Sequence, residues 1–231
     1  MTIAEKLTQI AENEQKVFDA GKSEATNEFW DVFTNNGERV NYSYAFYNWS
    51  SEYIRPTRKI IPTDEASARS TFYKCPNLKK IEAAYFDFSQ KNKGTSEATG
   101  YSYTFYGCKK LEEIEDIGIE ADYQFNHTFE CVKLRTIARI GTDENTKFSG
   151  AFDYASSLEN VTFDGVIGQN INVRWSTKLS KASIENIVSC LSDTASGKTL
   201  SLSQTAVNNA FTDAEWTALA DTKKNWTISL Q

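Results

Sequence analysis

The sequence lacks the patterns of several protein classes. It has a single histidine, and its four cysteines form no Cys-x-x-Cys pair, so the four convergent ligands of a zinc site are missing. No apolar run approaches the roughly 18–20 residues of a membrane span. The segment 1–18 carries acids early and has no continuous apolar region, unlike a secretory signal. We therefore expect no metal, no other cofactor, no membrane span and no cleaved leader.

Enzyme signatures are also absent. The chain has no Walker or dinucleotide-binding glycine pattern and no nucleophile elbow around which His127 could act as a base. We expect His127 to be a turn or flank residue. The acidic pairs at 112–113 and 143–144 have the composition of glycosidase carboxylates, but their place on a repeat strand or loop favours solvated charges. The sequence predicts a protein that is not an enzyme.

Charge and composition narrow the possible partners. The 231 residues carry a net charge of −6, which argues against a nucleic-acid partner. A hydrophobic content of 40% and an aromatic content of 13% are not those of a disordered chain. The length fits one elongated domain or two compact ones.

A motif built on phenylalanine recurs along the chain. TFYKCPNLKKI at 71–81 returns as TFYGCKKLEEI at 104–114, with aliphatic residues six and nine positions after the phenylalanine. Further copies begin at Phe129, where one residue is missing, and at Phe152, and a degenerate copy begins near Phe46. From Phe72 the starts fall 33, 24 and 23 residues apart, so one unit carries an insertion, which we place in the polar segment 90–102.

The spacing within each copy has a structural explanation. We expect the first aliphatic residue at a bend, and the second aliphatic and the residue two positions beyond it to alternate inward on a short strand. One unit cannot cover its own apolar side, so neighbouring units must stack and share a core. The motif is therefore repeated because a coil repeats, and a structural role explains it better than a single site.

The cysteines follow the same repeat. Cys75, Cys108 and Cys131 occupy one repeat position, and we expect them to form a buried ladder of free thiols, while Cys190 packs on a C-terminal helix. A disulfide between successive rungs is geometrically conceivable, because stacked strands lie about 4.8 Å apart. The missing secretion signal argues against it.

The motif F-x-x-C-x-x-L-x-x-I resembles that of leucine-rich repeats of the bacterial BspA-like (Treponema-type) class. The resemblance covers about residues 45–165, although the copy at Phe152 has lost the cysteine. It implies an α/β repeat solenoid, a right-handed coil with one short parallel strand per repeat on the concave side. It also implies recognition or adhesion at a bacterial surface.

The flanks of the repeats are predicted to be caps. The predicted organisation is one continuous domain with a helical N-terminal cap at 1–40, repeats at 41–165 and an α/β C-terminal cap at 166–231. A capping box at 2–5 begins the first helix, and a second helix is expected at 23–33. The flanks are similar to those of repeat proteins of phages and prophages of gut Firmicutes.

The C-terminal cap is predicted in detail. Apolar residues at 184–191 indicate a helix, and a strand follows at 199–202. A capping box formed by Thr212 and Glu215 begins another helix, and the chain closes with a strand at 226–230.

The aromatic run NYSYAFYNWSSEY at 41–53 has two interpretations. Its rings can cap the first coil, with Phe46 as the repeat phenylalanine. Exposed tyrosine and tryptophan rings can also stack on sugars or act as hot spots for a protein partner. We favour the cap, and a ring that stays exposed is then the best ligand candidate in this half of the chain.

The sequence thus predicts a non-catalytic binding protein whose partner is a protein or a surface glycan. Recognition or adhesion is expected at a bacterial surface, and a tail-associated protein of a phage or prophage is one form that this role can take. A structural assembly module of a virion or cell and a carbohydrate-binding domain remain as alternatives, and the oligomeric state stays open. The predicted binding surface consists of the outward positions of the strands: Lys79, Lys80, Glu82, Glu112, Glu113, Glu115, Arg135, Thr136, Ala138, Glu159, Asn160 and Thr162.

Overall fold

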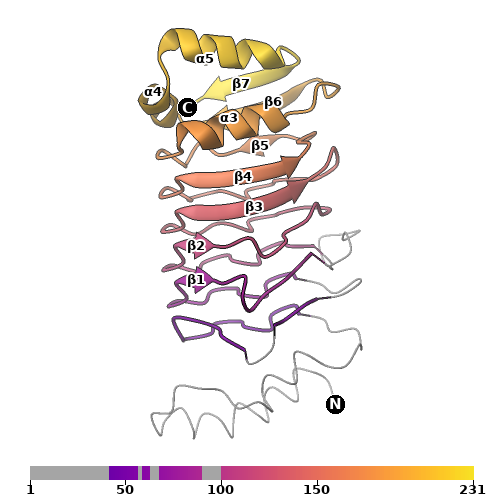
Figure 1. Ribbon diagram of the computed structural model, residues 1–231, viewed down its shortest axis with the longest axis vertical. Coiled ribbons are helices and arrows are strands. Elements are labelled where there is room, and N and C mark those ends of the chain that lie inside the picture. Colours follow the sequence, from indigo (N-terminus) through magenta and orange to yellow (C-terminus); the bar gives the residue numbers. More distant parts are fainter. Residues whose placement is uncertain (1–41, 57–58, 63–67, 90–99) are drawn as a thin grey trace, which may run out of the picture.

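The structure is a computed structural model that describes residues 42–56, 59–62, 68–89 and 100–231. Over these residues the chain winds into a stack of turns that follow one another in sequence order, and the C-terminal elements close one end (Figure 1). The predicted N-terminal cap at 1–40 lies outside the described residues.

A parallel sheet runs along one side of the stack. Its four strands lie in the order β1-β2-β3-β4, so each turn pairs with the next turn of the chain. The strands are β1 (Lys80–Ile81), β2 (Glu113–Ile114), β3 (Thr136–Thr142) and β4 (Asn160–Gly165). The second aliphatic of each repeat lies in register with that of the next: Ile81, Ile114, Ile137 and Val161. The repeat alignment made from the sequence is therefore the alignment of the sheet.

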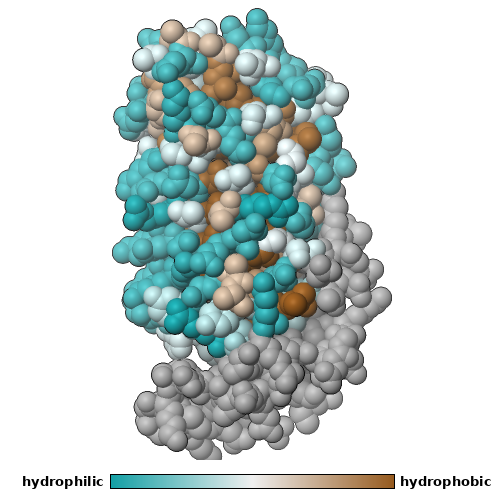
Figure 2. Space-filling view, viewed as in Figure 1, coloured by the Kyte–Doolittle hydropathy of each residue, from teal (hydrophilic) through white to brown (hydrophobic). Residues whose placement is uncertain are grey.

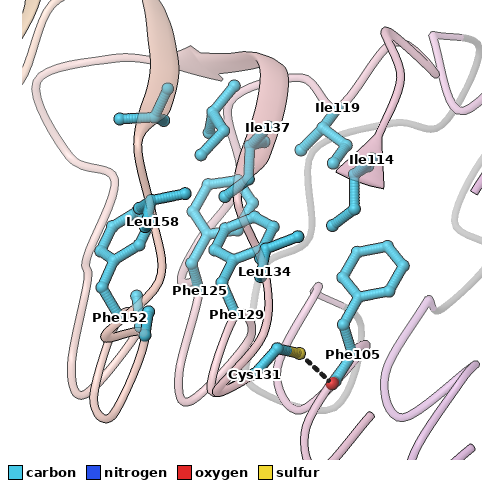
Figure 3. Packing of buried hydrophobic residues seen from close by; sticks show 14 of the residues in the cluster. Phe105, Ile114, Ile119, Phe125, Phe129, Cys131, Leu134, Ile137, Phe152 and Leu158 are labelled. Carbon is cyan, nitrogen blue, oxygen red and sulfur yellow. Dashed lines mark hydrogen bonds between the residues drawn. The ribbon is translucent and has the colours of Figure 1, made fainter. Parts of the chain in front are cut away.

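The repeat phenylalanines stack through the core. Each ring lies nearly parallel to the next, with centroid distances of 5.4, 5.3, 6.0 and 5.4 Å along the series. The series is Phe46, Phe72, Phe105, Phe129 and Phe152, and all five are buried. Figure 3 shows three of these rings, those of Phe105, Phe129 and Phe152, packed with leucine and isoleucine side chains of the core. Burying a side chain of this size contributes roughly 1.5–3 kcal/mol relative to leaving it exposed, so the apolar core explains why the motif repeats.

The third apolar position of the predicted strand pattern is wrong in two turns. Two residues beyond Ile114 the chain has the exposed Asp116, and two beyond Ile137 it has Arg139. The buried residues are instead Ile117 and Ile140, three positions beyond. A register shift between β3 and β4 places Ile140 opposite Phe163, so the extra residue is absorbed there without exposing an apolar side chain.

The predicted insertion at 90–102 ends earlier than the sequence suggested. Residues 90–99 lie outside the described residues, but Tyr101 and Ser102 are buried within the stack. The ring of Tyr101 stacks on Phe125 at 5.3 Å, and Phe125 stacks on Phe148 at 5.8 Å. These three rings form a second column in the core, so Tyr101 belongs to the turn and not to a surface loop.

The missing residue of the copy at Phe129 is accommodated by a tighter turn. In that copy the Cys131 N–H donates to the carbonyl of Phe129 at 2.7 Å, two residues back. In the preceding copy the Cys108 N–H donates to Phe105, three residues back. The turn therefore shortens locally, and the cysteine keeps its place in the core.

The C-terminal region confirms the elements predicted there. Helix α3 (Lys181–Cys190) packs on β4, and the strands β5 (Ile171–Asn172), β6 (Lys198–Leu202) and β7 (Trp226–Leu230) form a second parallel sheet in the order β5-β6-β7. Leu191, which the sequence placed in the helix, is its C-cap.

Further helices close this end of the stack. Helix α5 (Asp213–Ala220) begins with the predicted capping box, and the 3-10 turn η1 (Asp221–Lys223) leads into β7. The sequence did not predict helix α4 (Gln204–Ala210), which begins at the N-cap Ser203.

Candidate functional site

The twelve predicted binding residues lie along β1 to β4 and the turns next to them, and five of their charged members pair with one another. Lys80 Nζ lies 3.0 Å from Glu113 Oε2 and 2.5 Å from Glu115 Oε1. Arg135 makes two contacts with Glu159, at 2.9 and 3.2 Å. Much of the charge on this strand face is therefore neutralised across turns.

Two members of the set pair with residues that the sequence analysis did not single out. Glu82 accepts two hydrogen bonds from Arg55, at 2.8 and 3.0 Å, and Lys79 Nζ lies 2.8 Å from Glu52 Oε2. Exposed pairs of this kind contribute about 0–1 kcal/mol each. Figure 2, which views this side of the molecule, shows a largely hydrophilic surface with narrow apolar strips. The strand face is polar, and much of its charge is already paired across turns. None of the twelve predicted residues on it is aromatic.

A second surface comes from backbone positions two residues before each core phenylalanine. These positions all have a positive φ, between 48° and 62°: Tyr44, Ser70, Tyr103, His127 and Gly150. Left-handed backbone costs an L-residue roughly 1–2 kcal/mol, whereas glycine adopts it readily. Tyrosine therefore occupies this position at an energetic cost in two turns, and such backbone outliers point to a role in function.

The tyrosines directly after the core phenylalanines form a first ring row. Tyr47 stacks on Tyr73 at 5.7 Å, and Tyr73 stacks on Tyr106 at 5.1 Å, with the rings within 11° of parallel. These residues are 26 and 33 positions apart in the chain. The row follows the stack as the core ladder does, on the outside of the turns.

The left-handed positions carry a second ring row, which consists of Tyr44, Tyr103 and His127. Tyr103 and His127 stack at 5.4 Å, while Tyr44 and Tyr103 each meet Tyr73 edge to face at 6.4 Å. Tyr44 is 51% exposed and Tyr47 is 52% exposed. The two ring rows together form a continuous aromatic surface over several turns.

The described part of the aromatic run at 41–53 contains both buried and exposed rings. Tyr42 and Phe46 are buried and cap the core, and burial raises the pKa of Tyr42 to about 12. Tyr44 and Tyr47 point outward. The sequence analysis missed the continuation of this surface through Tyr73, Tyr103 and Tyr106, although the repeated F-Y pair in TFYK and TFYG is the signal that marks it.

A hollow lies within the aromatic surface. Its volume is about 760 Å³, and the described residues that line it are Tyr44, Tyr47, Arg69, Ser70, Tyr73, Lys74 and Tyr103. The ammonium of Lys74 lies 5.1 Å from the centroid of the Tyr73 ring, and the guanidinium of Arg69 lies 5.5 Å from that of Tyr103. The hollow therefore combines ring surfaces with positive charge.

His127 is a turn residue, as predicted. Its Nδ1 lies 2.9 Å from Glu130 Oε2, and its ring covers Gly150. The negative charge of Glu130, with burial as a smaller cause, raises the pKa of Tyr106. The imidazole of His127 stacks on Tyr103 and so belongs to the second ring row.

The cysteines form the predicted ladder of buried free thiols. Cys75, Cys108 and Cys131 are buried and Cys190 is half-buried on α3, and none forms a disulfide. Burial, first among its causes, raises the pKa of Cys108 well above its ordinary value. A group of three or more side chains able to hold a metal ion does not occur within the part of the chain that the structure describes.

No helix among the described residues could span a membrane. Comparison with protein-family models, curated proteins and solved structures finds no match to this chain.

Proposed function

We propose that this chain is a leucine-rich-repeat solenoid of the BspA-like kind that acts as a non-catalytic binding protein. It recognises a protein or a glycan at a bacterial surface. The observation that carries the proposal is the aromatic surface, in which tyrosines occupy left-handed backbone positions in spite of the conformational cost.

The physical basis is the rigidity of this surface. The rings of the first row stack on one another, and each belongs to the residue directly after a buried core phenylalanine, so a partner meets side chains that are already ordered. A pre-ordered surface loses little conformational entropy on binding. Tyrosine is enriched at binding hot spots because its ring offers a large contact area and its hydroxyl a hydrogen bond.

The flanking sequences, which resemble those of phage and prophage repeat proteins, favour a role in a virion-associated or surface-associated tail protein. The second candidate is a structural assembly module. The self-paired charges of the strand face favour it, because a face whose ions are already neutralised has fewer free groups for a specific ligand.

The proposal is tested with the full chain on intact bacterial cells and on arrays of extracellular proteins and surface glycans, with affinities measured by biolayer interferometry. The variant Tyr47→Ala/Tyr73→Ala removes two rungs of the first ring row and is expected to lower affinity by about tenfold or more. The variant Glu113→Lys/Glu115→Lys tests the strand face. Loss of binding only in the second variant assigns recognition to the predicted strand-face residues instead.

The matched control is Tyr154→Ala. Tyr154 is an exposed tyrosine with φ of 59° that stacks on Trp175, outside both ring rows. It reports the general effect of removing a surface tyrosine. A chain that binds no cell, protein or glycan but assembles into defined oligomers contradicts the proposal and supports the assembly module.

A further inference from the structure

Strand β7 is the last strand of the second sheet and has a neighbour on one side only. The order β5-β6-β7 leaves its other edge without a strand among the described residues. Backbone groups alternate between the two edges of a strand. Because the Gln231 N–H donates to the carbonyl of Leu202 in β6, the N–H and C=O of Ile228 and Leu230 face away from β6. No described side chain bonds to these outward groups.

Strand β4 also ends its sheet, but its edge is capped by side chains of α3. The N–H of Val161 donates to Ser183 Oγ at 3.0 Å, and the N–H of Phe163 donates to Asn186 Oδ1 at 2.7 Å. Asn186 in turn donates to the carbonyl of Phe163 at 3.1 Å. Helix α5, the outermost helix in Figure 1, packs on α3 and gives β7 no such cap. Of these two sheet ends, only β7 keeps its outward backbone groups unpaired within the described part of the chain.

The inward side chains of β7 are also incompletely covered. Leu200 and Leu202, the inward residues of β6, are fully buried. Ile228 and Leu230 hold the matching positions in β7 and pack against the same core, but they are only half-buried. This end of the stack therefore presents apolar side chains next to unpaired backbone groups, and a further β-strand would satisfy both.

The composition of β7 allows two copies of it to approach each other. Charged residues or proline on an edge strand prevent it from pairing with another chain. Each strand of the first sheet contains a charged residue, whereas β7, with the sequence WTISL, contains neither a charge nor a proline. Two copies of this edge therefore bring no like charges together when they pair.

We infer that β7 pairs antiparallel with β7 of a second copy of this chain, about a two-fold axis at Ser229. In this register Ile228 lies opposite Leu230 of the second copy, and each such pair exchanges two backbone hydrogen bonds. The apolar pairs join the two cores, while Thr227 lies opposite Gln231 on the polar face. Every side chain thus meets one of its own class, which makes the edge complementary to itself, as a two-fold dimer requires.

The test measures the mass of the full chain in solution by analytical ultracentrifugation from micromolar to millimolar concentration, where we expect a reversible monomer–dimer equilibrium. Ile228→Pro removes one outward N–H from each copy and no bond to β6, and edge strands tolerate proline at such a position. It is expected to raise the dissociation constant of the dimer by about tenfold or more. Ile228→Val keeps the N–H and is its control, with a much smaller effect expected.

A charge placed on the axis tests the register. Directly opposite residues have Cβ atoms about 4.5–5.5 Å apart, so Ser229→Lys sets two like charges against each other and is expected to abolish the dimer. Mixing Ser229→Lys with Ser229→Glu is expected to restore it as a mixed dimer. Ser201→Lys is the matched control, because Ser201 lies in register with Ser229 one strand further from the axis, and it is expected to leave the dimer intact.

A monomer over the whole concentration range overturns the inference, as does a dimer that both Ile228→Pro and Ser229→Lys leave unchanged. Larger head-to-tail assemblies also contradict the two-fold pairing. If Ile228→Pro does not fold, as judged by circular dichroism, the mixing experiment at Ser229 carries the test.

The dimer and the proposed recognition function are tested separately, because β7 contributes no residue to either ring row. A chain that dimerises through β7 but binds no cell, protein or glycan overturns the proposed function and leaves this inference intact. A monomer that binds a partner through the ring rows does the reverse.

Discussion

Cys108 donates its thiol hydrogen to the carbonyl oxygen of Phe72 in the preceding turn, over an Sγ to O distance of 2.9 Å. Cys75 and Cys131 make the same contact with the phenylalanine carbonyl of their own preceding turns. Each thiol is thus packed as a small apolar group and also ties one turn to the next. The cysteine ladder is a structural device that follows the core phenylalanines.

The first prediction concerns the core. Leu111 is fully buried at the bend before β2, so Leu111→Ala leaves a cavity and is expected to lower the free energy of unfolding by about 2–5 kcal/mol. Urea denaturation measures the change. Lys109→Ala, at an exposed position of the same turn, is the control and is expected to change stability by less than about 0.5 kcal/mol. An equally small effect of Leu111→Ala would falsify the repeat register.

The second prediction concerns the thiols. Because only thiolates react quickly, the buried Cys75, Cys108 and Cys131 are expected to resist a thiol reagent in the folded protein and to react on denaturation. The half-buried Cys190 is the internal comparison, and we expect it to react first. Labelling followed by peptide mass spectrometry assigns each site, and rapid labelling of all four in the native protein contradicts the buried ladder.

The third prediction concerns pH. Lys181, followed by the backbone N–H and hydroxyl of Thr212, lowers the pKa of Glu215 to about 2 from the ordinary 4.5. Because the folded-state pKa is the lower one, this carboxylate stabilises the fold fully above pH 4.5, and the contribution disappears as pH falls toward 2.

The measurement compares the unmodified chain with Glu215→Gln by thermal unfolding between pH 6 and pH 2. We expect the unmodified chain to be the more stable at pH 6 and the difference to shrink below pH 4.5. A difference that stays constant over this range means that the charge of Glu215 contributes nothing to the capping box of α5.

The fourth prediction couples a glycine to a ring. Gly150 has φ of 62°, and a Cβ placed there would lie 2.6 Å from the imidazole of His127, which is held by its stack on Tyr103. Gly150→Ala is therefore expected to lower stability by about 1–3 kcal/mol.

A double-mutant cycle separates the two causes. His127→Ala removes the clash but not the backbone strain, so Gly150→Ala is expected to cost less in the His127→Ala background than in the unmodified chain. Chemical denaturation of the four proteins gives the coupling. Strictly additive effects would show that the imidazole does not cover Gly150.

Local sequence was enough to predict several elements. The capping box of α5 needs only Thr212 and Glu215, three residues apart, and the apolar residues of α3 recur at helical spacing. Strand β7 was predicted with the bounds that the structure gives it. Helix α4 was missed because its seven residues carry too few apolar positions for a period to be recognised.

The sequence by itself determined the core. Phenylalanine, cysteine, leucine and isoleucine recur at fixed offsets, and a unit that cannot bury its own apolar side must share that side with its neighbours. The offsets therefore predicted the buried phenylalanine of each copy and the two aliphatic residues six and nine positions after it, whereas the buried Ile117 and Ile140 did not follow from them.

Only the tertiary structure decided the surface. Tyr73 and Tyr106 are 33 residues apart in the chain, yet their rings stack at 5.1 Å, because the turns lie in register. Arg55 reaches Glu82 across 27 residues for the same reason. Contacts between turns depend on the length of every turn and on the sign of the backbone φ angles, which no single repeat reveals. The ring rows and the paired strand face therefore became visible only when the turns were stacked.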